Sequence, residues 1–312
     1  MSATATRNLV LVHTPGWQGV GDFEAIKAQV EAMAPDIAVF IVSNAAREPM
    51  ARKKAAARPS LIFSPLRLMS FRPDRGRIYA GRSMSKLEEM ETLARGGLPV
   101  PRFEEIRPET VLSEEVYGPF TVVKPSHALA SWGQGIELMR TRDVRYRPPA
   151  AFPADHPARH APLVAQRFID CGHAMTCRVL TLFGAPLFTY IRQSTVPLAL
   201  DPAAERFGTA DFMPVPETSS AAITRDADFL GLAKAAHEAM PDIALQACDI
   251  LRDKHGGLHI LEVNPGGGTW MFSSETAWGY KKRLGIDDLA APFDAFGTAA
   301  RVLVDRTRAE AL

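Results

Sequence analysis

The sequence has almost no excess of charge of either sign: 36 lysines and arginines stand against 35 aspartates and glutamates, a net charge of +1 over 312 residues. Dedicated nucleic-acid-binding proteins usually carry a basic excess, so we expect no nucleic-acid partner. No apolar run approaches the ~18–20 residues of a membrane span, so we expect no membrane partner. The first residues, MSATATRN, lack the apolar core of a signal peptide, and a cytoplasmic protein is the expectation.

Cysteine is scarce as well. Cys171, Cys177 and Cys248 are odd in number and are not spaced as metal ligands, so we expect reduced, inert thiols. The chain has no internal repeat, no low-complexity tract and no G-x-x-x-x-G-K-[ST] loop. Its 46% of hydrophobic residues allow a sizeable core, which excludes disorder as a description of the whole chain.

The first 80 residues have the pattern of a parallel α/β unit. Apolar segments at 8–13 and 37–42 flank a glycine-rich loop and a stretch of helical spacing over 23–33. This strand, loop, helix and strand order predicts parallel pairing. Short strands are expected at 61–63 and 77–80.

The charge is uneven along the chain. Residues 47–86 hold eleven lysines and arginines against Glu48 and Asp74. This segment is either a solvated basic face or a positive mouth for an anionic substrate or nucleotide, and both interpretations stay open.

A helix is predicted from about residue 86 to residue 95. Ser85 and Glu88 fit a capping box, and Gly96-Gly97 fits the end. Lys86 then lies in the first turn, where a cation opposes the helix dipole. A phosphate bound nearby would compensate for this unfavourable interaction between the Lys86 charge and the helix dipole.

The most informative feature is a predicted hairpin of strands at 245–251 and 258–263. A centre between residues 255 and 256 places Asp249 opposite Glu262, and strand alternation puts Asn264 on the same face. Two carboxylates directly across a sheet repel each other. Together with an amide oxygen they suit Mg²⁺, although a solvated acidic edge is the alternative.

Glycine-containing loops follow two of the predicted strands. Lys124 ends a strand over 120–124 and precedes a loop with Gly133 and Gly135, which suits phosphate binding or an ordinary hairpin. Gly266, Gly267 and Gly268 follow Asn264, where main-chain N–H groups can approach a substrate carboxylate or form a tight turn.

Strands in the middle of the chain complete the pattern. The segment LVAQRFID at 163–170 is either a core strand or an edge that presents main-chain groups to adenine and Asp170 to ribose. The remaining expected elements are strands at 136–139, 178–183 and 186–192, a helix at 229–240, and irregular segments at 140–162 and 194–222.

Taken in order, these segments resemble the ATP-grasp superfamily. The matching segments are Ser85-Lys86 before a helix ending in GGLPVP, VVKP at 122–125, SWGQGI at 131–136, AQRFID at 165–170, CRVLTLFGAPL at 177–187, CDIL at 248–251 and LEVNP at 261–265. The spacing of Asp249, Glu262 and Asn264 matches the D-alanine–D-alanine ligase and glutathione synthetase branches. The segment from Cys177 onward is similar to the glutathione synthetase and ribosomal-protein glutamate ligase branch.

The resemblance implies a Rossmann-like N-terminal α/β domain followed by a two-lobed α+β ATP-grasp fold. The implied domains are residues 1–82, a small lobe over 83–165 and a C-terminal lobe over 166–312. It also implies site residues. Those for ATP are Lys86, Lys124, Ser131, Gly133, Gly135, the adenine hinge Gln166, Arg167, Phe168 and Ile169, and Asp170 near the ribose. Those for Mg²⁺, or Mn²⁺, are Asp249, Glu262 and Asn264. The implied catalytic residues are Arg178 and Arg192.

The activity implied by the resemblance is that of a carboxylate–amine ligase. ATP phosphorylates a carboxylate of a small molecule or peptide, and an amine attacks the acyl phosphate to give an amide or peptide bond, ADP and phosphate. Members of the superfamily are often homodimers. The alternatives are an ATP-grasp phosphotransferase with a hydroxyl acceptor, like the inositol phosphate kinases, and a non-catalytic ATP-binding module, as in synapsin-like proteins.

Overall fold

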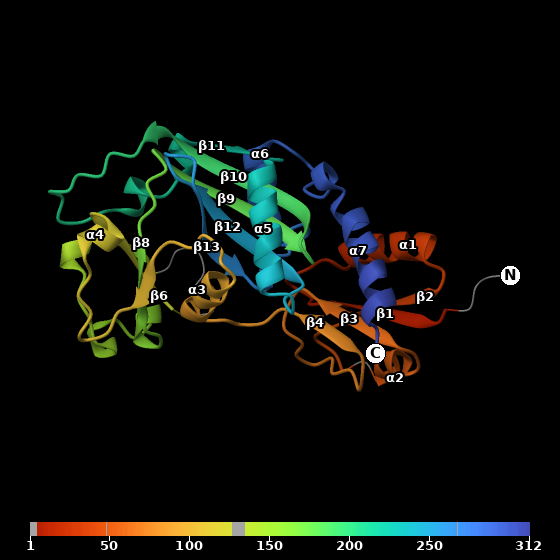
Figure 1. Cartoon of the computed structure of the whole chain (residues 1–312). Coiled ribbons are helices and arrows are strands. Elements are labelled where there is room, and N and C mark those ends of the chain that lie inside the picture. Colours follow the sequence, from red (N-terminus) through yellow and green to blue (C-terminus); the bar gives the residue numbers. More distant parts are fainter. Residues whose placement is uncertain (1–4, 48, 127–134, 267) are drawn as a thin grey trace.

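Three sheets follow one another along the chain in a computed structural model that describes residues 5–47, 49–126, 135–266 and 268–312. Figure 1 shows the N-terminal sheet at one end of the molecule, the second sheet at the other end and the third sheet between them. Among the described residues, no helix combines the length and the hydrophobicity needed to cross a membrane.

The N-terminal sheet is parallel, as the sequence predicts. Its strands are β1 (Arg7–His13), β2 (Ile37–Ser43), β3 (Ser60–Ser64) and β4 (Arg77–Ala80), in the order β2-β1-β3-β4. Five consecutive residues of β1 are buried, as expected for a parallel strand that is covered on both faces. The covering helices include α1 (Val20–Met33), which begins three residues before the predicted start, and α2 (Pro49–Ala56), which the sequence analysis did not predict.

The second sheet is antiparallel and lies in the segment predicted as the small lobe, although its last strand continues to Arg167. Its strands are β5 (Phe103–Glu105), β6 (Phe120–Pro125), β7 (Glu137–Arg140) and β8 (Leu163–Arg167), in the order β5-β8-β6-β7. A short helix, α4 (Glu114–Tyr117), packs on it, and residues 141–162 contain only 3₁₀ turns, η1 (Thr141–Asp143), η2 (Pro149–Ala151) and η3 (Pro157–Arg159).

The third sheet is also antiparallel and carries the predicted hairpin. Its strands are β9 (His173–Leu182), β10 (Ala185–Pro197), β11 (Ser219–Ala222), β12 (Leu245–Arg252) and β13 (Leu258–Asn264), in the order β11-β10-β9-β12-β13. Helix α5 (Ala227–Ala239) lies across one face (Figure 1). The expectation of an irregular segment over 194–222 is wrong at both ends, because β10 continues to Pro197 and β11 pairs with it. The turns η4 (Thr209–Asp211) and η5 (Pro216–Thr218) lie between them.

Four further helical elements complete the fold. They are α3 (Lys86–Arg95), α6 (Ala277–Leu284), η6 (Ala291–Phe293) and α7 (Ala295–Glu310). Helix α7 packs on α1, β1 and β10. One hydrophobic core therefore contains Leu9 and Phe63 of the N-terminal sheet together with Leu180 of β9 and Leu303 of α7. This shared core fixes the N-terminal sheet against the third sheet.

Candidate active site

A row of four polar side chains crosses the third sheet. Tyr190 of β10 is opposite Arg178 of β9, Arg178 is opposite Asp249 of β12, and Asp249 is opposite Glu262 of β13. Directly opposed residues of antiparallel strands share a face. The predicted pairing of Asp249 with Glu262 is therefore confirmed.

The pairing depends on a β-bulge. Residues 250–252 pair in a register that would place Asp249 opposite Leu261, and the register shifts between Asp249 and Ile250 so that Glu262 takes this place. A bulge adds one residue to one strand of an antiparallel pair. In this hairpin it brings the second carboxylate onto the face that carries the first.

Arg178 holds the Asp249 carboxylate in a bidentate ion pair. Arg178 Nε lies 2.7 Å from Asp249 Oδ1, and its Nη2 lies 2.6 Å from Oδ2. Burial raises the pKa of Asp249, although the charge of Arg178 opposes that shift. Asn264 Nδ2 lies 3.5 Å from Asp249 Oδ2 and 3.2 Å from Glu262 Oε1, so the three predicted metal ligands converge.

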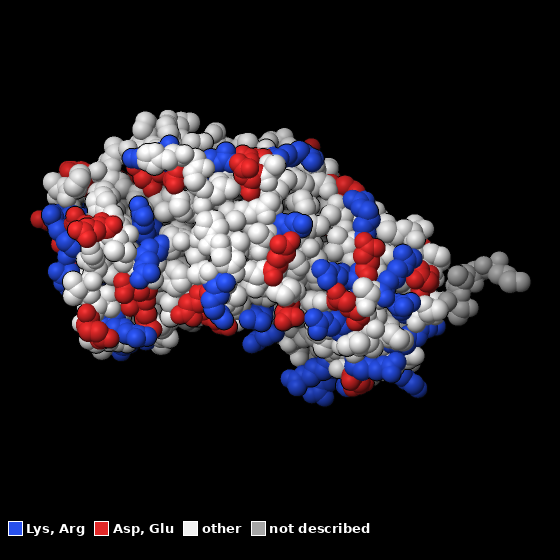
Figure 2. Space-filling view, viewed as in Figure 1, with Lys and Arg blue, Asp and Glu red and all other residues white. Residues whose placement is uncertain are grey.

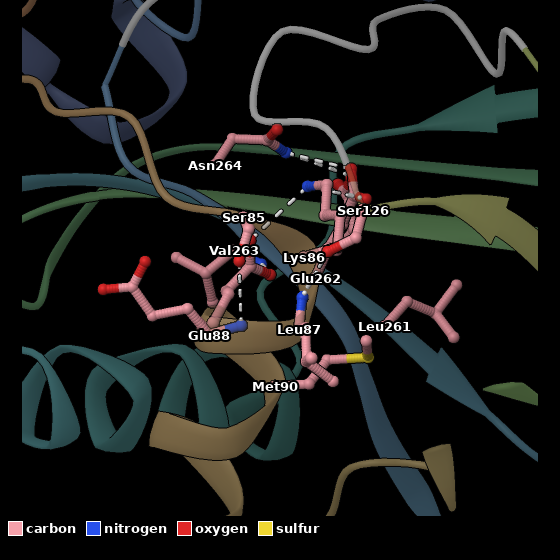
Figure 3. Close-up of polar contacts among 12 residues, drawn as sticks. Ser85, Lys86, Leu87, Glu88, Met90, Ser126, Leu261, Glu262, Val263 and Asn264 are labelled. Atoms are coloured by element: carbon pink, nitrogen blue, oxygen red, sulfur yellow. Dashed lines mark hydrogen bonds and ion pairs between the residues drawn. The ribbon is translucent and has the colours of Figure 1, made fainter. Parts of the chain in front are cut away.

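Helix α3 brings Lys86 to the same carboxylates. Ser85 Oγ accepts from Glu88 N at 3.2 Å, which confirms Ser85 as the N-cap, and Lys86 lies in the first turn. Lys86 Nζ is 2.9 Å from Glu262 Oε2, and Figure 3 shows the two side chains meeting between α3 and β13. Burial alone would raise the pKa of Glu262, but the charges of Lys86 and Lys124 outweigh it and hold the pKa well below its usual range.

Glu89, which the sequence analysis did not single out, is the third acid of this cluster. It is 1% exposed, its Oε2 lies 3.4 Å from Lys86 Nζ, and its other oxygen accepts from Val263 N. Burial raises the pKa of Glu89 to about 7, against the charge of Lys86. The signal was the helical spacing of Lys86, Glu89, Met90 and Leu93, which are the buried residues of α3.

Lys124 approaches from β6 of the small lobe. It is 6% exposed, and in the part of the chain that the structure describes it forms no ion pair. Burial lowers the pKa of Lys124, while the charges of Glu262 and Glu89 oppose that shift. The structure therefore brings the two predicted phosphate-binding lysines from separate elements to one group of carboxylates.

The loop after Lys124 falls largely outside the described residues, and the predicted Ser131 and Gly133 lie there. Gly135 is described and has a φ of 73°. A Cβ at this position would lie 3.0 Å from Pro125 Cγ and 3.1 Å from the ring of His156. Both the backbone conformation and the lack of space therefore require glycine here.

The predicted adenine hinge lies where β8 leaves the small lobe. Gln166 is 2% exposed, and its Nε2 is 3.2 Å from Met90 Sδ and 3.4 Å from the carbonyl oxygen of Leu261. Its side chain therefore joins β8 to α3 and β13. The main-chain N–H groups of the next two residues are also occupied. Arg167 N donates to the carbonyl oxygen of Arg102, and Phe168 N donates to that of Phe120.

The last hinge residues lie beside the turn between β12 and β13. Ile169 is buried. Asp170 Oδ2 forms an ion pair with Lys254 Nζ at 2.9 Å. Burial alone would raise the pKa of Asp170, but the bond from Lys254 outweighs it and lowers the pKa. Asp170 is thus tied to this turn by a partner that the sequence analysis did not predict.

The glycines after β13 meet the N-terminal domain. Gly266 has a φ of 90°, and a Cβ there would lie 2.5 Å from the carbonyl oxygen of Pro65 and 2.6 Å from Gly81 Cα. Gly268 lies beside the Trp17 ring, which a Cβ would meet at 3.6 Å. Gly267 lies outside the described residues. The carboxyl edge of the parallel sheet therefore lies directly against the segment that follows β13.

Arg192 lies on the same sheet face as Arg178, two residue pairs further along the strands. It is opposite Thr176 on β9, and its Nε donates to Ser219 Oγ at 2.8 Å. Arg192 thus lies next to the row that contains Arg178 and Asp249, and it forms no ion pair with a carboxylate in the described chain.

The donor set fits a hard divalent cation. Among the described residues, no three His, Cys, Asp or Glu side chains are arranged to hold a metal ion. The donors at this site are the carboxylates of Asp249 and Glu262 and the amide of Asn264. Mg²⁺ is usually bound by one or two carboxylates and keeps water and phosphate ligands, which suits this set. Turning the Asn264 amide over would present its oxygen where Nδ2 now faces both carboxylates.

The basic segment lies on the N-terminal domain. Arg47, Lys53, Arg67, Arg72 and Arg75 are exposed and form no ion pair within the described chain. Figure 2 shows blue side chains gathered at the lower edge of the molecule, over α2 and the connection from β3 to β4.

No family model matches this sequence, and no curated protein matches it. Solved structures do match over nearly the whole chain. The ATP-grasp ligase PsnB with precursor peptide PsnA2 and AMPPNP has a TM-score of 0.54 at 15% identity and covers 98% of this chain and 99% of that chain.

Two more matches have the same extent. The macrocyclase MdnC from Microcystis aeruginosa MRC, bound with precursor peptide MdnA, has a TM-score of 0.53 at 14% identity and covers 95% of this chain and 99% of that chain. The D-cycloserine synthetase DcsG has a TM-score of 0.51 at 13% identity with the same coverage. The chain therefore has the ATP-grasp fold, as its sequence motifs imply.

Proposed function

We propose that this protein is an ATP-dependent carboxylate–amine ligase that forms an amide or peptide bond through an acyl phosphate. A carboxylate oxygen of the first substrate attacks the γ-phosphorus of ATP, and the bond to the β-phosphate oxygen breaks to release ADP. The amine of the second substrate then attacks the acyl carbon. The carbon–oxygen bond breaks, inorganic phosphate leaves, and the nitrogen loses a proton.

The observation that carries this proposal is the charge arrangement around Glu262. Lys86 pairs with it, Lys124 is buried nearby without an ion pair in the described chain, and Arg178 holds Asp249 in the same row. A buried ammonium that lacks a paired anion is costly. A triphosphate supplies that anion, and phosphoryl transfer depends on such positioning and charge stabilisation.

Each residue has a role in this account. Lys86 and Lys124 bind phosphate oxygens as point charges. Arg178 binds Asp249 through Nε and Nη2, and its remaining N–H groups would stabilise the charge that develops on the transferring phosphoryl group. Asp249, Glu262 and Asn264 would hold Mg²⁺, which neutralises phosphate charge when bound. The structure of PsnB with a phosphomimetic variant of its minimal precursor, Mg and ADP has a TM-score of 0.52 to this chain, and it supports Mg²⁺ and ATP as the cofactors of this fold.

The substrates of the similar proteins suggest a class of carboxylate. PsnB and MdnC are described with precursor peptides, whereas the name of DcsG refers to a small molecule. We therefore include both peptide and small-molecule carboxylates. The free thiols Cys171, Cys177 and Cys248 suit the reducing cytoplasm in which we place this reaction.

One observation favours a second candidate, a phosphotransferase with a polyanionic hydroxyl acceptor. The exposed arginines of the basic segment lie on the domain whose carboxyl sheet edge meets Gly266. Such a field attracts anions. The cluster at Asp249 and Glu262 serves either reaction. We favour the ligase because the compared structures, a ligase, a macrocyclase and a synthetase, share this fold over nearly their whole length.

The test is a screen that measures ADP release from ATP and Mg²⁺ with pairs of carboxylates and amines. The ligase account predicts release that requires both substrates, and trapping of the carboxylate as a hydroxamate when hydroxylamine replaces the amine. A phosphorylated alcohol with no hydroxamate would favour the phosphotransferase. Tight ATP binding without turnover would favour a non-catalytic module.

A further inference from the structure

Tyr190 ends the row of four polar side chains on the third sheet, and its hydroxyl has no hydrogen-bond partner among the described residues. It stands opposite Arg178, and it is 5% exposed. In the part of the chain that the structure describes, its buried oxygen makes no hydrogen bond. Buried polar groups are nearly always paired, and an unpaired one calls for an explanation.

Arg192 shows the same feature two residues along β10. Its Nε donates to Ser219, but its Nη2 is buried and has no hydrogen-bond partner among the described residues. Alternate residues of a strand lie on one face. Two unsatisfied donors, a phenol and a guanidinium, therefore lie side by side on the face that carries Arg178.

Helix α6 covers this part of the face. The ring of Tyr280 meets Tyr190 edge-on at 4.7 Å between centroids. The Arg283 guanidinium lies 5.8 Å from the Tyr190 centroid and 5.5 Å from that of Tyr280. Within the described chain Arg283 forms no ion pair, so this corner holds two arginines, Arg192 and Arg283, without a paired carboxylate.

A hollow of about 310 Å³ opens at the same place. It is lined by Glu275, Thr276, Trp278, Gly279, Tyr280 and Arg283. Tyr280 and Arg283 thus both line the hollow and pack on Tyr190. This volume is at the lower end of small-molecule sites, which begin near ~300 Å³, and suits one functional group with a short stem. Tyr190 and Arg192 do not line this hollow themselves, and Tyr280 and Arg283 connect it to the unsatisfied donors behind it. Glu275 is the acid of the lining, so an anion is expected on the side of Arg283 and Tyr190.

We propose that Tyr190, Arg192 and Arg283 form a subsite for a substrate carboxylate that is not phosphorylated. The inference rests on the proposed function and narrows the substrate class to compounds with a second carboxylate, such as a dicarboxylate or the free α-carboxylate of an amino acid or peptide. A carboxylate has two acceptor oxygens, which can take bonds from the phenol and from both guanidinium groups. Monocarboxylates without such a group are poor substrates.

The experiment uses calorimetry on the full chain without nucleotide, with glutarate as the dicarboxylate probe and neutral glutaramide as its control. The wild type binds glutarate and not glutaramide. Arg283→Ala weakens glutarate binding about tenfold or more, the loss of a charge-assisted bond. Tyr190→Phe, which removes only the hydroxyl, weakens it about threefold to tenfold.

Lys282→Ala is the matched control, because it removes a cation from the next position of α6, where Lys282 lies over the exposed ring of Trp278. This variant keeps wild-type glutarate affinity. The subsite is overturned if the wild type fails to bind glutarate, or if Arg283→Ala and Lys282→Ala behave alike. Failure of the proposed function is separate, since it shows as absent ADP release while glutarate binding persists.

Discussion

Glu262 is the residue at which the proposed phosphate and metal sites meet, because it pairs with Lys86 and faces Asp249 and Asn264. Glu262→Gln removes the charge but keeps the shape. Turnover should fall at least roughly 100-fold, because replacing a residue that only supports a metal ligand already lowers activity by up to about 100-fold. Stabilisation by Mg-ATP, which follows its binding to the folded state, should disappear from thermal unfolding curves.

Glu238→Gln is the control for that variant, because Glu238 also pairs with a lysine, Lys234, but on an exposed surface of α5. It should behave as the wild type in both assays. A Glu262→Gln protein that Mg-ATP still stabilises like the parent would contradict the metal assignment.

Lys124 should show the opposite effects on stability and on binding. Burial lowers its pKa, which means that the fold disfavours the charged ammonium. Lys124→Met should therefore raise the melting temperature of the protein alone while weakening ATP binding, because the phosphates lose a cation. Adenosine binding should be unchanged in calorimetry. Lys234→Met serves as the exposed control, and equal losses for ATP and adenosine would show that Lys124 does not act on phosphate.

At this scale the sequence predicted the acids better than their partners. Strand alternation placed Glu262 and Asn264 on one face. The pair of Asp249 and Glu262 was predicted from a regular hairpin centred between residues 255 and 256, whereas the structure forms the same pair through a β-bulge. Glu89 and the bond from Lys254 to Asp170 were not predicted, because they join elements distant in sequence whose packing no local pattern determines.

Among the elements, the β12–β13 hairpin carries the proposed metal ligands, and Asp253 holds its turn. The carboxylate accepts from His255 N at 2.8 Å, Gly257 N at 2.9 Å and His259 Nε2 at 2.8 Å. The bond from His259, followed by those from the backbone, lowers the pKa of Asp253 from 3.8 to about 2. A lowered carboxyl pKa means that the folded state favours the ionised form.

Asp253→Asn should therefore lower the free energy of unfolding by about 1–3 kcal/mol near neutral pH, the typical loss when hydrogen bonds to a charged group are removed. The contribution of the charge is present above the ordinary pKa of 3.8 and is lost as the pH falls toward about 2, so the wild type and the variant should converge there. Denaturant unfolding at several pH values measures this. Asp201→Asn, with a single turn bond to Ala203, is the control, and a gap that does not change with pH would contradict the account.

Most of the expected strands and helices were found within a few residues of their predicted bounds, whereas β5, β11, α2, α4, α6, α7 and the hairpin bulge were not predicted. Helix α2 has only Ala55 fully buried, so its sequence shows little apolar periodicity. Strand β11 is a short edge strand of small residues, SSAA, which forms only because β10 extends beside it. The bulge changes register without leaving any mark in composition.

For the whole molecule, the contact between Gly266 and the N-terminal sheet sets how the site faces that domain. Gly266→Ala places a Cβ 2.5 Å from the Pro65 carbonyl oxygen at a φ of 90°. We expect a loss of about 1–3 kcal/mol for the backbone conformation alone, plus the cost of displacing the domain. Gly97→Ala is the matched control, since Gly97 has a φ of 74° with nothing within 4 Å of the added Cβ. Equal losses of melting temperature in the two variants would show that the contact contributes nothing.

The order of the three sheets was predictable from the ordered motifs, but the way in which α7 joins the N-terminal sheet to the third sheet was not. That core combines the first and the last segments of the chain, and the burial that stabilises it depends on the completed fold. The domain boundaries at residues 82 and 165 stay a prediction.

The measurement that tests the central claim most directly is the fate of a carboxylate oxygen during turnover. With a carboxylate substrate labelled with oxygen-18, the amine, ATP and Mg²⁺, one labelled oxygen should appear in the inorganic phosphate, because that oxygen attacks phosphorus and leaves carbon with the phosphate. Mass spectrometry of the products detects it. Unlabelled phosphate, or label in AMP, would contradict the acyl-phosphate ligase.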